Sequence, residues 1–223
     1  MSLDGRIAPP LRGKIQIGEK GDRKVLEEAL SWADATLIGA RTLKEHKSIC
    51  LIKNQKLLKA RQLQGKSNQP IAIIVGTKNL YSPEWIFFNQ PVERWLLSKK
   101  EGKMSLIQNR IFHKKIYFQN TWLDTLLMIK KKGITKIALL GGAILSESLL
   151  KEDLIDELQL TITPKILGGK NTWITTNISN LPLEFTKKES WEIKECKSLV
   201  GDEIMLRYYR RKQDNDKKKN NIL

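Results

Sequence analysis

Residues 135–163 carry the strongest structural signal in the sequence. An apolar run at 135–140 ends in Gly141-Gly142, an amphipathic stretch follows at 143–151, and residues 156–163 alternate between apolar and polar before Pro164. Short apolar runs bounded by glycine or proline are typical of strands, and helical spacing of apolar residues predicts a helix. We therefore predict a buried strand, a helix and a second strand, a unit that belongs to folds with a parallel sheet covered by helices.

The same alternation occurs upstream of this unit. Helical spacing predicts three further helices, over 20–33, 54–64 and 121–132. Apolar or β-branched runs predict four further strands, over 35–39, 70–75, 94–98 and 115–118. Near the end, 185–194 and 203–210 alternate as strands around Gly201-Asp202, which predicts an antiparallel hairpin.

Together these elements predict a three-layer α/β domain with a mostly parallel sheet and a C-terminal antiparallel hairpin at one edge. The domain is expected to span residues 1–211. Residues 212–223 have no apolar period and many lysines, so we expect a disordered basic tail there.

Composition excludes several classes of protein. The longest apolar runs are far shorter than the roughly 20 residues that a membrane helix needs, and the first residues lack the pattern of a secretory signal, so a cytoplasmic location is expected. With two cysteines and two histidines, no metal site is expected. The formal charge of +16 would attract anions, which include nucleic acid and phosphorylated metabolites.

Three predicted strands end in residues that suit a phosphate-bearing ligand. Ligands of parallel sheets bind beyond the carboxyl ends of the strands, where glycines let backbone amides approach phosphates. The candidate cofactor-binding residues are Gly39, Arg41, Thr42, Thr77, Lys78, Gly141 and Gly142. Each motif alone is weak: Thr42 could simply be the N-cap of a helix beside a solvated Arg41, and 75–78 could be a surface turn. Because a dinucleotide spans adjacent strands, the set favours NADPH, with Lys78 near the ribose 2′-phosphate.

Three stretches carry a resemblance to a known family: the opening SLDGRIA, the segment ADATLIGARTLKEH, and IALLGGAILSESLLKEDLIDELQLTITPKILGG. Their order resembles the dihydrofolate reductase-like superfamily, in particular the pyrimidine reductase of riboflavin biosynthesis, over most of residues 1–170. That family reduces 5-amino-6-(5-phosphoribosylamino)uracil to its ribitylamino form with hydride from NADPH. The resemblance implies the same activity here, and it implies that Ser146–Thr163 takes part in a two-fold homodimer.

The resemblance also implies roles for individual residues. Gly39, Arg41 and Thr42 match a loop that contacts the cofactor phosphates, and Thr77 matches the position that faces the 2′-phosphate. The pair Gly141 and Gly142 matches the pyrophosphate turn. At the nicotinamide and substrate end we place Ser2, Asp4 and His46. Asp4 is the catalytic candidate, as a ligand of a substrate hydroxyl or a proton relay, or it could brace the turn before Gly5.

The sequence departs from the family pattern at several positions. Leu140 stands where a substrate-binding Glu is usual, and His46 stands where an Asp is common, so His46 could bind a phosphate or be a plain surface residue. The strand that precedes SLDG in the family is missing here, from which we expect an upstream start codon. The deaminase signatures H-x-E and P-C-x-x-C do not occur in the 223 residues, which predicts a stand-alone reductase.

Three alternatives stay open. One is a dihydrofolate reductase-like NADPH reductase of another heterocycle, which the change at Leu140 allows. The second is a basic nucleic-acid-binding protein, although lysines outnumber arginines and the tryptophans are scattered, so a nucleic-acid partner is disfavoured. The third is a member that has lost catalysis and survives as a binding protein.

Overall fold

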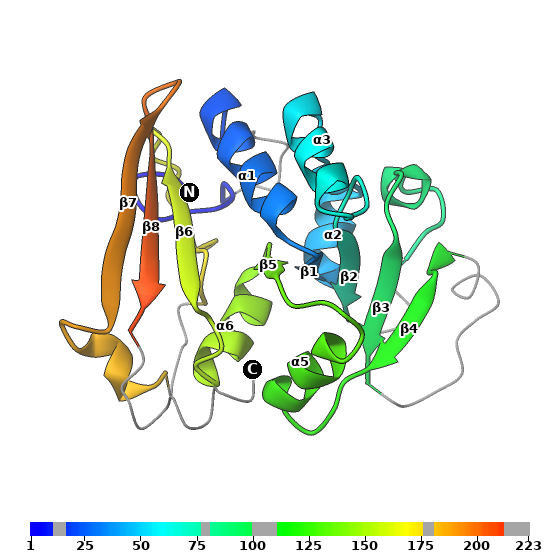
Figure 1. Ribbon diagram of the computed structural model, residues 1–223. Coiled ribbons are helices and arrows are strands. Elements are labelled where there is room, and N and C mark those ends of the chain that lie inside the picture. The colour runs from blue at the N-terminus through cyan, green and yellow to red at the C-terminus, as the bar shows by residue number, and fades with distance from the viewer. Residues whose placement is uncertain (11–16, 77–80, 100–110, 176–180, 212–223) are drawn as a thin grey trace. The chain divides into compact units, whose positions relative to one another are not determined.

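The computed structural model describes residues 1–10, 17–76, 81–99, 111–175 and 181–211 (Figure 1). The chain forms two compact units: Val25–Leu145 is one, and Met1–Lys24 together with Ser146–Leu223 is the other. Each is described by itself.

The unit Val25–Leu145 is built on a parallel sheet of five strands (Figure 1). The strands are β1 (Ala35–Gly39), β2 (Ile71–Val75), β3 (Arg94–Ser98), β4 (Lys114–Tyr117) and β5 (Ile137–Leu139), in the spatial order β4-β3-β2-β1-β5. The helices along this part of the chain are α1 (Lys20–Trp32), α2 (Ala40–His46), α3 (Gln55–Leu63), the short 3-10 helix η1 (Ile86–Asn89) and α5 (Trp122–Lys130). The expected helices and parallel strands are confirmed, and the bounds of β1 and β3 match the prediction to the residue.

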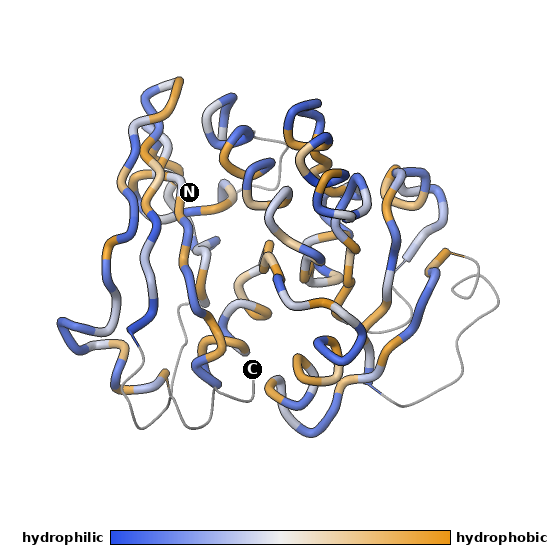
Figure 2. The backbone as a smooth tube through the Cα atoms, in the orientation of Figure 1, coloured by the Kyte–Doolittle hydropathy of each residue, from blue (hydrophilic) through white to orange (hydrophobic). Residues whose placement is uncertain are grey.

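Both faces of this sheet are covered. Side chains alternate along a strand, so Ile74 and Leu96 on one face are buried with Phe87 and Phe112, whereas Leu37 and Leu97 point to the other face and are buried as well. Figure 2 shows the trace of β2, all of whose residues are apolar, as predominantly hydrophobic. A parallel sheet that is buried on both sides explains why its strands read as unbroken apolar runs.

Strand β5 differs from the prediction of a buried strand. Its three residues are only half-buried, and within the described residues it pairs with β1 alone. An edge strand lacks a neighbour on one side, which leaves its side chains partly open.

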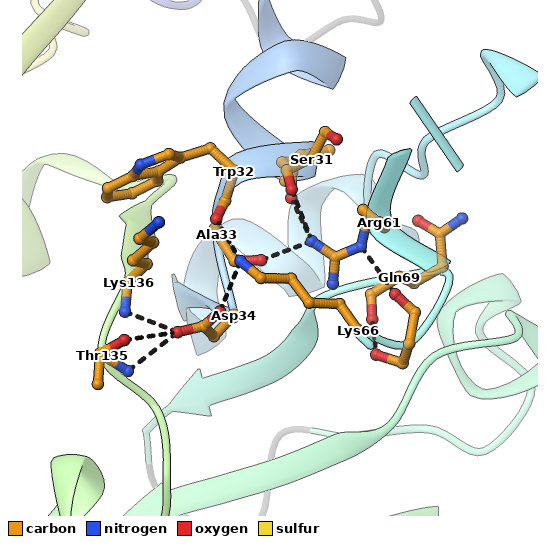
Figure 3. A network of polar contacts seen from close by, with 11 residues as sticks. Ser31, Trp32, Ala33, Asp34, Arg61, Lys66, Gln69, Thr135 and Lys136 are labelled. Carbon is orange, nitrogen blue, oxygen red and sulfur yellow. Dashed lines mark hydrogen bonds and ion pairs between the residues drawn. The ribbon is translucent and has the colours of Figure 1, made fainter. Parts of the chain in front are cut away.

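A polar network fixes the end of the sheet at which β1 begins (Figure 3). The buried Arg61 of α3 donates to the carbonyls of Leu30 and Ala33, which lie at the end of α1, at 3.1 and 2.6 Å. Asp34 accepts from the amide of Lys136 at 2.9 Å and pairs with Lys66 at 2.8 Å. The guanidinium thereby satisfies the last carbonyls of a helix, which have no partner within the helix itself.

The second unit contains an antiparallel sheet of three strands. These are β6 (Glu157–Ile162), β7 (Trp191–Leu199) and β8 (Glu203–Arg210), in the order β6-β8-β7, and α6 (Ala143–Lys151) precedes them. The C-terminal hairpin is confirmed, with Asp202 in its turn at a φ of 55°. It pairs with β6 rather than with the parallel sheet, so the expectation that it forms an edge of that sheet is wrong. The sequence also predicts β6 as the second strand of a strand-helix-strand unit in a parallel sheet, and this is wrong as well, because β6 pairs antiparallel with β8. Phe185 lies in the 3-10 helix η2 (Leu183–Thr186), and β7 begins six residues later at Trp191.

Two further predictions concern membrane-spanning helices and the C-terminal tail. No helix in the described ranges is both long and apolar enough to cross a bilayer. The expected tail at 212–223 lies outside the described residues.

Candidate active site

Glycines at the ends of β1 and β5 meet in the unit Val25–Leu145. The amide of Gly39 donates to the carbonyl of Gly141 at 2.8 Å. A Cβ atom placed on Gly142 would lie 2.8 Å from Oγ1 of Thr42, and one on Gly39 would lie 3.5 Å from the amide nitrogen of Gly142. We call these residues, Gly39, Thr42, Gly141 and Gly142, the glycine cradle. The structure thus brings together four of the seven residues that the sequence predicts for the cofactor.

The sheet explains why these residues meet. Strands β1 and β5 are parallel neighbours in the register Ala35 to Ile137, so they end at the same level. Gly141 has a φ of 85°, a conformation that favours glycine, and the peptide bond between Gly141 and Gly142 is cis. The end of β2 joins the same edge, because a Cβ on Gly76 would lie only 2.3 Å from Cβ of Ala40.

The glycine cradle has the chemistry of a phosphate site. A side chain on Gly142 would collide with Thr42, and α6 begins directly after Gly142, where the first amides of a helix have in general no carbonyl of a preceding turn to bond. The residues therefore fit the pyrophosphate of a dinucleotide. Among the described residues, no group of three or more His, Cys, Asp and Glu side chains could hold a metal ion.

The other site residues that the sequence predicts for this unit lie in different environments or outside the described residues. Thr42 is not the N-cap of α2: that position is Gly39, and Thr42 lies in the first turn with Oγ1 beside Gly142. Arg41 is exposed, and His46 is exposed at the far end of α2. Thr77 and Lys78 lie outside the described residues.

Ser2 and Asp4 form a second polar cluster, which lies in the other unit. Oγ of the buried Ser2 donates to Oδ1 of Asp4 at 2.5 Å. The carboxylate of Asp4 also accepts the amides of Leu167 and Gly168, at 3.1 and 2.7 Å. Asp4 thus connects the opening turn of the chain to the loop that follows β6.

The environment of Asp4 stabilises its charged form. The hydrogen bond from Ser2 is the largest cause, and together with the amides of Leu167 and Gly168 it lowers the pKa of Asp4 to about 2. Asp4 is therefore ionised at neutral pH and accepts hydrogen bonds. This arrangement supports the bracing role that the sequence left open, and the catalytic role stays a prediction.

Sequence reasoning missed the contact between Asp4 and the loop at Leu167 and Gly168. The two segments are more than 160 residues apart, and no local pattern connects them. The available signal was that both belong to the tracts that carry the family resemblance.

Several proteins of known structure have folds similar to that of this chain. Solved structures share the fold: RibD of Acinetobacter baumannii superposes with a TM-score of 0.74 at 17% identity, covering 94% of this chain and 55% of that one. A pyrimidine reductase-like protein of Corynebacterium diphtheriae superposes with a TM-score of 0.71 at 18% identity, covering 95% of this chain and 89% of that one. The chain therefore spans about half the length of the Acinetobacter RibD chain.

Two curated relatives match over most of their length. They are named 2,5-diamino-6-ribosylamino-4(3H)-pyrimidinone 5′-phosphate reductase. The protein of Archaeoglobus fulgidus is 22% identical over 175 residues, 77% of this chain and 80% of the relative. That of Methanothermobacter thermautotrophicus is 22% identical over 212 residues, 93% of this chain and 94% of the relative.

A family model decides the assignment. The model described as RibD C-terminal domain matches residues 1–196, which is most of the chain, and the mixed α/β fold agrees with the solved RibD structures. The chain belongs to the RibD C-terminal domain family.

Proposed function

We propose that the protein is an NADPH-dependent reductase that converts 5-amino-6-(5-phosphoribosylamino)uracil to its ribitylamino form in riboflavin biosynthesis. The observation that carries the proposal is the glycine cradle, where two neighbouring strands of a RibD-type sheet end around open backbone. Conversion of a ribosyl to a ribityl group adds one hydride and one proton. NADPH, when bound, supplies the hydride.

The glycine cradle would hold the dinucleotide. Gly141 and Gly142 would offer their backbone to the pyrophosphate, with Thr42 Oγ1 beside Gly142 as a further donor. The amide of Gly39 is bonded to the carbonyl of Gly141, so Gly39 holds the two strand ends together and leaves room for the ligand. Arg41 is exposed next to this site and can pair with a phosphate. Contact of Thr77 and Lys78 with the 2′-phosphate stays a prediction from the sequence.

Asp4 would act at the substrate end by position. Its carboxylate fixes Ser2 on one side and the amides of Leu167 and Gly168 on the other. An ionised carboxylate holds no proton of its own at neutral pH, so relay of a proton through Asp4 stays a prediction from the sequence. His46 is exposed and remains a candidate ligand of the substrate phosphate.

A second substrate is favoured by a specific observation. The relatives that match over 80% and 94% of their own length are named for a diaminopyrimidinone phosphate. That compound carries an amino group where the uracil carries an oxygen. Because Leu140 replaces a carboxylate that is usual at the substrate, this position does not fix which of the two is reduced.

One experiment tests the activity and chooses the substrate. Purified protein is incubated with NADPH and either pyrimidine phosphate, and the loss of reduced nicotinamide absorbance is followed with product identification by mass spectrometry. We expect turnover of at least one compound, faster with NADPH than with NADH. Tight NADPH binding without turnover of either compound would favour a reductase of another heterocycle, and no NADPH binding would overturn the proposal.

A homodimer is part of the proposal, and the antiparallel sheet supports it. Residues that pair across the three strands share one face, which is apolar yet not buried. Its apolar members are Leu158, Leu160, Ile162, Ile193, Cys196, Ile204, Leu206 and Tyr208, and Ser198, which pairs with Ile204, lies on the same face. Ile193 and Ile204 are 54% and 43% exposed. An apolar patch of this kind marks an interaction surface, and a second copy can cover it around a two-fold axis.

The cellular location and the role of the positive charge are also part of the proposal. A cytoplasmic location accords with a cofactor and substrate that are metabolites. The basic surface of a chain with a formal charge of +16 would collect phosphorylated ligands, so a nucleic-acid partner is not required to explain it.

A further inference from the structure

An open cavity of about 580 Å³ lies at the start of strands β3 and β4, in the unit Val25–Leu145. Residues 90–94, together with Phe88 and His113, line it. Because the strands of this sheet are parallel, β3 and β4 begin at the edge opposite to the one where β1 and β5 end in the glycine cradle. The cavity is therefore separate from the proposed cofactor site.

The imidazole of His113 contributes a hydrogen-bond donor to this cavity. The backbone amide of Arg94 donates to Nδ1 of His113 at 3.0 Å. An amide nitrogen only donates, so Nδ1 is the acceptor, and the hydrogen-bond network assigns the proton of the neutral ring to Nε2. Nε2 lies 3.4 Å from Nη2 of Arg94. A guanidinium nitrogen is also a donor only, so neither of these two groups can accept a hydrogen bond from the other.

The guanidinium of Arg94 is held in place by its other donors. Nε donates to the carbonyl of Ile111 at 2.9 Å, and Nη1 donates to the carbonyls of Gln90 and Val92 at 3.1 and 3.2 Å. Within the described ranges, Arg94 forms no ion pair with a carboxylate. Nη2 is therefore a fixed and positively charged donor that remains for a ligand.

One acidic side chain, Glu93, also lines the cavity, but it is bonded elsewhere. Its Oε1 accepts the indole N–H of Trp95 at 2.6 Å. Because side chains alternate along a strand, Glu93 and Trp95 lie on one face of the sheet and Arg94 lies on the other. The face of Arg94 carries the buried cluster to which Phe88 and Val92 belong. The cavity thus combines an apolar floor with a positive charge.

These groups define a class of ligand. Carboxylate and phosphate oxygens accept strong hydrogen bonds from guanidinium and imidazole groups. A volume of about 580 Å³ is in the range of small-molecule sites, so a body larger than the anionic group itself has room. We propose that this cavity is a second binding site, for a small molecule with an oxyanion group on an apolar body. One oxyanion oxygen accepts from both Arg94 Nη2 and His113 Nε2.

The test titrates phenyl phosphate, benzoate and inorganic phosphate into the full-length protein at constant ionic strength, and NMR follows the amide signals of residues 94 and 113. We expect saturable shifts with at least one aromatic probe. A preference for phenyl phosphate would identify a phosphate as the anionic group, and a preference for benzoate would identify a carboxylate. Inorganic phosphate should bind more weakly, because it has no apolar body. Equal affinity for inorganic phosphate and the better aromatic probe would contradict the apolar part of the site.

Two variants test the donors. Arg94→Gln should weaken binding of the aromatic probes by about tenfold or more, because a charge-assisted hydrogen bond is lost. Since Arg94 also bonds three carbonyls, His113→Phe is the second variant: it keeps a ring at an exposed position, removes Nε2 and should weaken binding by about threefold to tenfold. Melting curves check that each variant folds.

Lys114→Gln is the matched control. It removes one positive charge from the exposed neighbour of His113, whose ammonium group lies 4.4 Å from the ring centroid of Trp95, a residue on the opposite face from Arg94. At moderate ionic strength this change should alter the affinity by less than about twofold. A loss as large as that of Arg94→Gln would mean that general charge attraction, rather than the cavity, binds the probes.

The outcomes separate this inference from the proposed function. Absence of saturable shifts with both aromatic probes, or wild-type affinity in the folded variants, would overturn the second site. Repeating the titration with saturating NADPH should leave probe binding unchanged, whereas loss of probe binding would place the probes in the cofactor site. The variants test the cavity whether or not the protein binds NADPH.

Discussion

The amide of Gly39 donates a hydrogen bond of 2.8 Å to the carbonyl of Gly141, and this contact joins two strand ends that are separated by a hundred residues of chain. It aligns the backbone at the ends of β1 and β5, where a side chain on Gly142 would collide with Thr42. The glycine cradle consists mostly of backbone, so we expect that adding a single methyl group to one of its glycines weakens binding of the cofactor.

Gly142→Ala should weaken NADPH binding by about tenfold, because the added Cβ lies 2.8 Å from Thr42 Oγ1 and occupies the space offered to the pyrophosphate. Fluorescence titration measures the effect. The double variant with Thr42→Ala removes the collision with the hydroxyl, so partial recovery relative to Gly142→Ala is expected. No recovery would mean that the methyl group excludes the ligand directly.

Asp4→Asn should lower stability at neutral pH, because the amide keeps only part of the acceptor capacity that Ser2, Leu167 and Gly168 use. The folded pKa of Asp4, about 2, lies below its ordinary value of 3.8, so its stabilising effect is present above pH 4 and is lost as the pH falls toward 2. Chemical denaturation across this range should show wild type and variant converging at low pH. A constant difference would contradict the assigned ionisation.

The same variant separates bracing from proton transfer. If Asp4 only positions the turn, the pH profile of kcat should keep its shape in Asp4→Asn while its height falls. Loss of an entire limb of the profile would instead identify Asp4 as the proton relay.

Asp34→Asn tests the opposite end of the sheet. Partial burial alone would raise the pKa of Asp34, but hydrogen bonds from Lys66 and from Thr135 and Lys136 outweigh burial and lower the pKa to about 2. After allowance for solvent screening, loss of the charge should cost about 1 kcal/mol of unfolding free energy at neutral pH, with the effect vanishing as the pH falls from about 4 to 2. NADPH affinity should not change, because this network lies where β1 begins. A change in affinity would show coupling between the two ends.

Leu206→Lys should convert the proposed dimer to a monomer. Leu206 pairs with Leu160 and Cys196 in the middle of the apolar face, and a buried lysine there would be unpaired. Light scattering coupled to gel filtration gives the mass, and circular dichroism checks the fold. Tyr209→Lys, on the opposite face of the same strand, is the control and should remain dimeric. A wild type that is monomeric at micromolar concentration contradicts the dimer itself.

The sequence predicted those parts of the fold that local periodicity controls. Helix α6 and strands β1 and β3 have the predicted bounds, because apolar spacing marks their extent and glycines mark the end of β1 and the start of α6. The prediction failed where tertiary context decides. Phe185 continues an alternating pattern but lies in a 3-10 helix, packed edge to face with Trp191 at a centroid distance of 5.7 Å. The apolar sequence of β5 predicts a buried strand, but its three residues are only half-buried. The reason is that β5 lies at one end of the strand order, and local periodicity does not determine that order.

The site was predictable to the extent that strand ends meet at one edge of a parallel sheet. That rule places Gly39 beside Gly141 and Gly142, which the structure confirms. The rule cannot give the partners of Asp4, because these depend on how a loop more than 160 residues away returns to the start of the chain.

The most direct test of the account compares wild type with Gly142→Asp for turnover of the ribosylaminopyrimidine phosphates with NADPH. The aspartate adds both a side chain beside Thr42 and a negative charge at the proposed pyrophosphate, so activity should fall by about a hundredfold or more. Gly65→Asp is the control: its added Cβ would meet no atom within 4 Å, and although a φ of 69° strains the backbone there, activity per folded protein should be retained. Equal rates for wild type and Gly142→Asp would contradict the cofactor site at the glycine cradle.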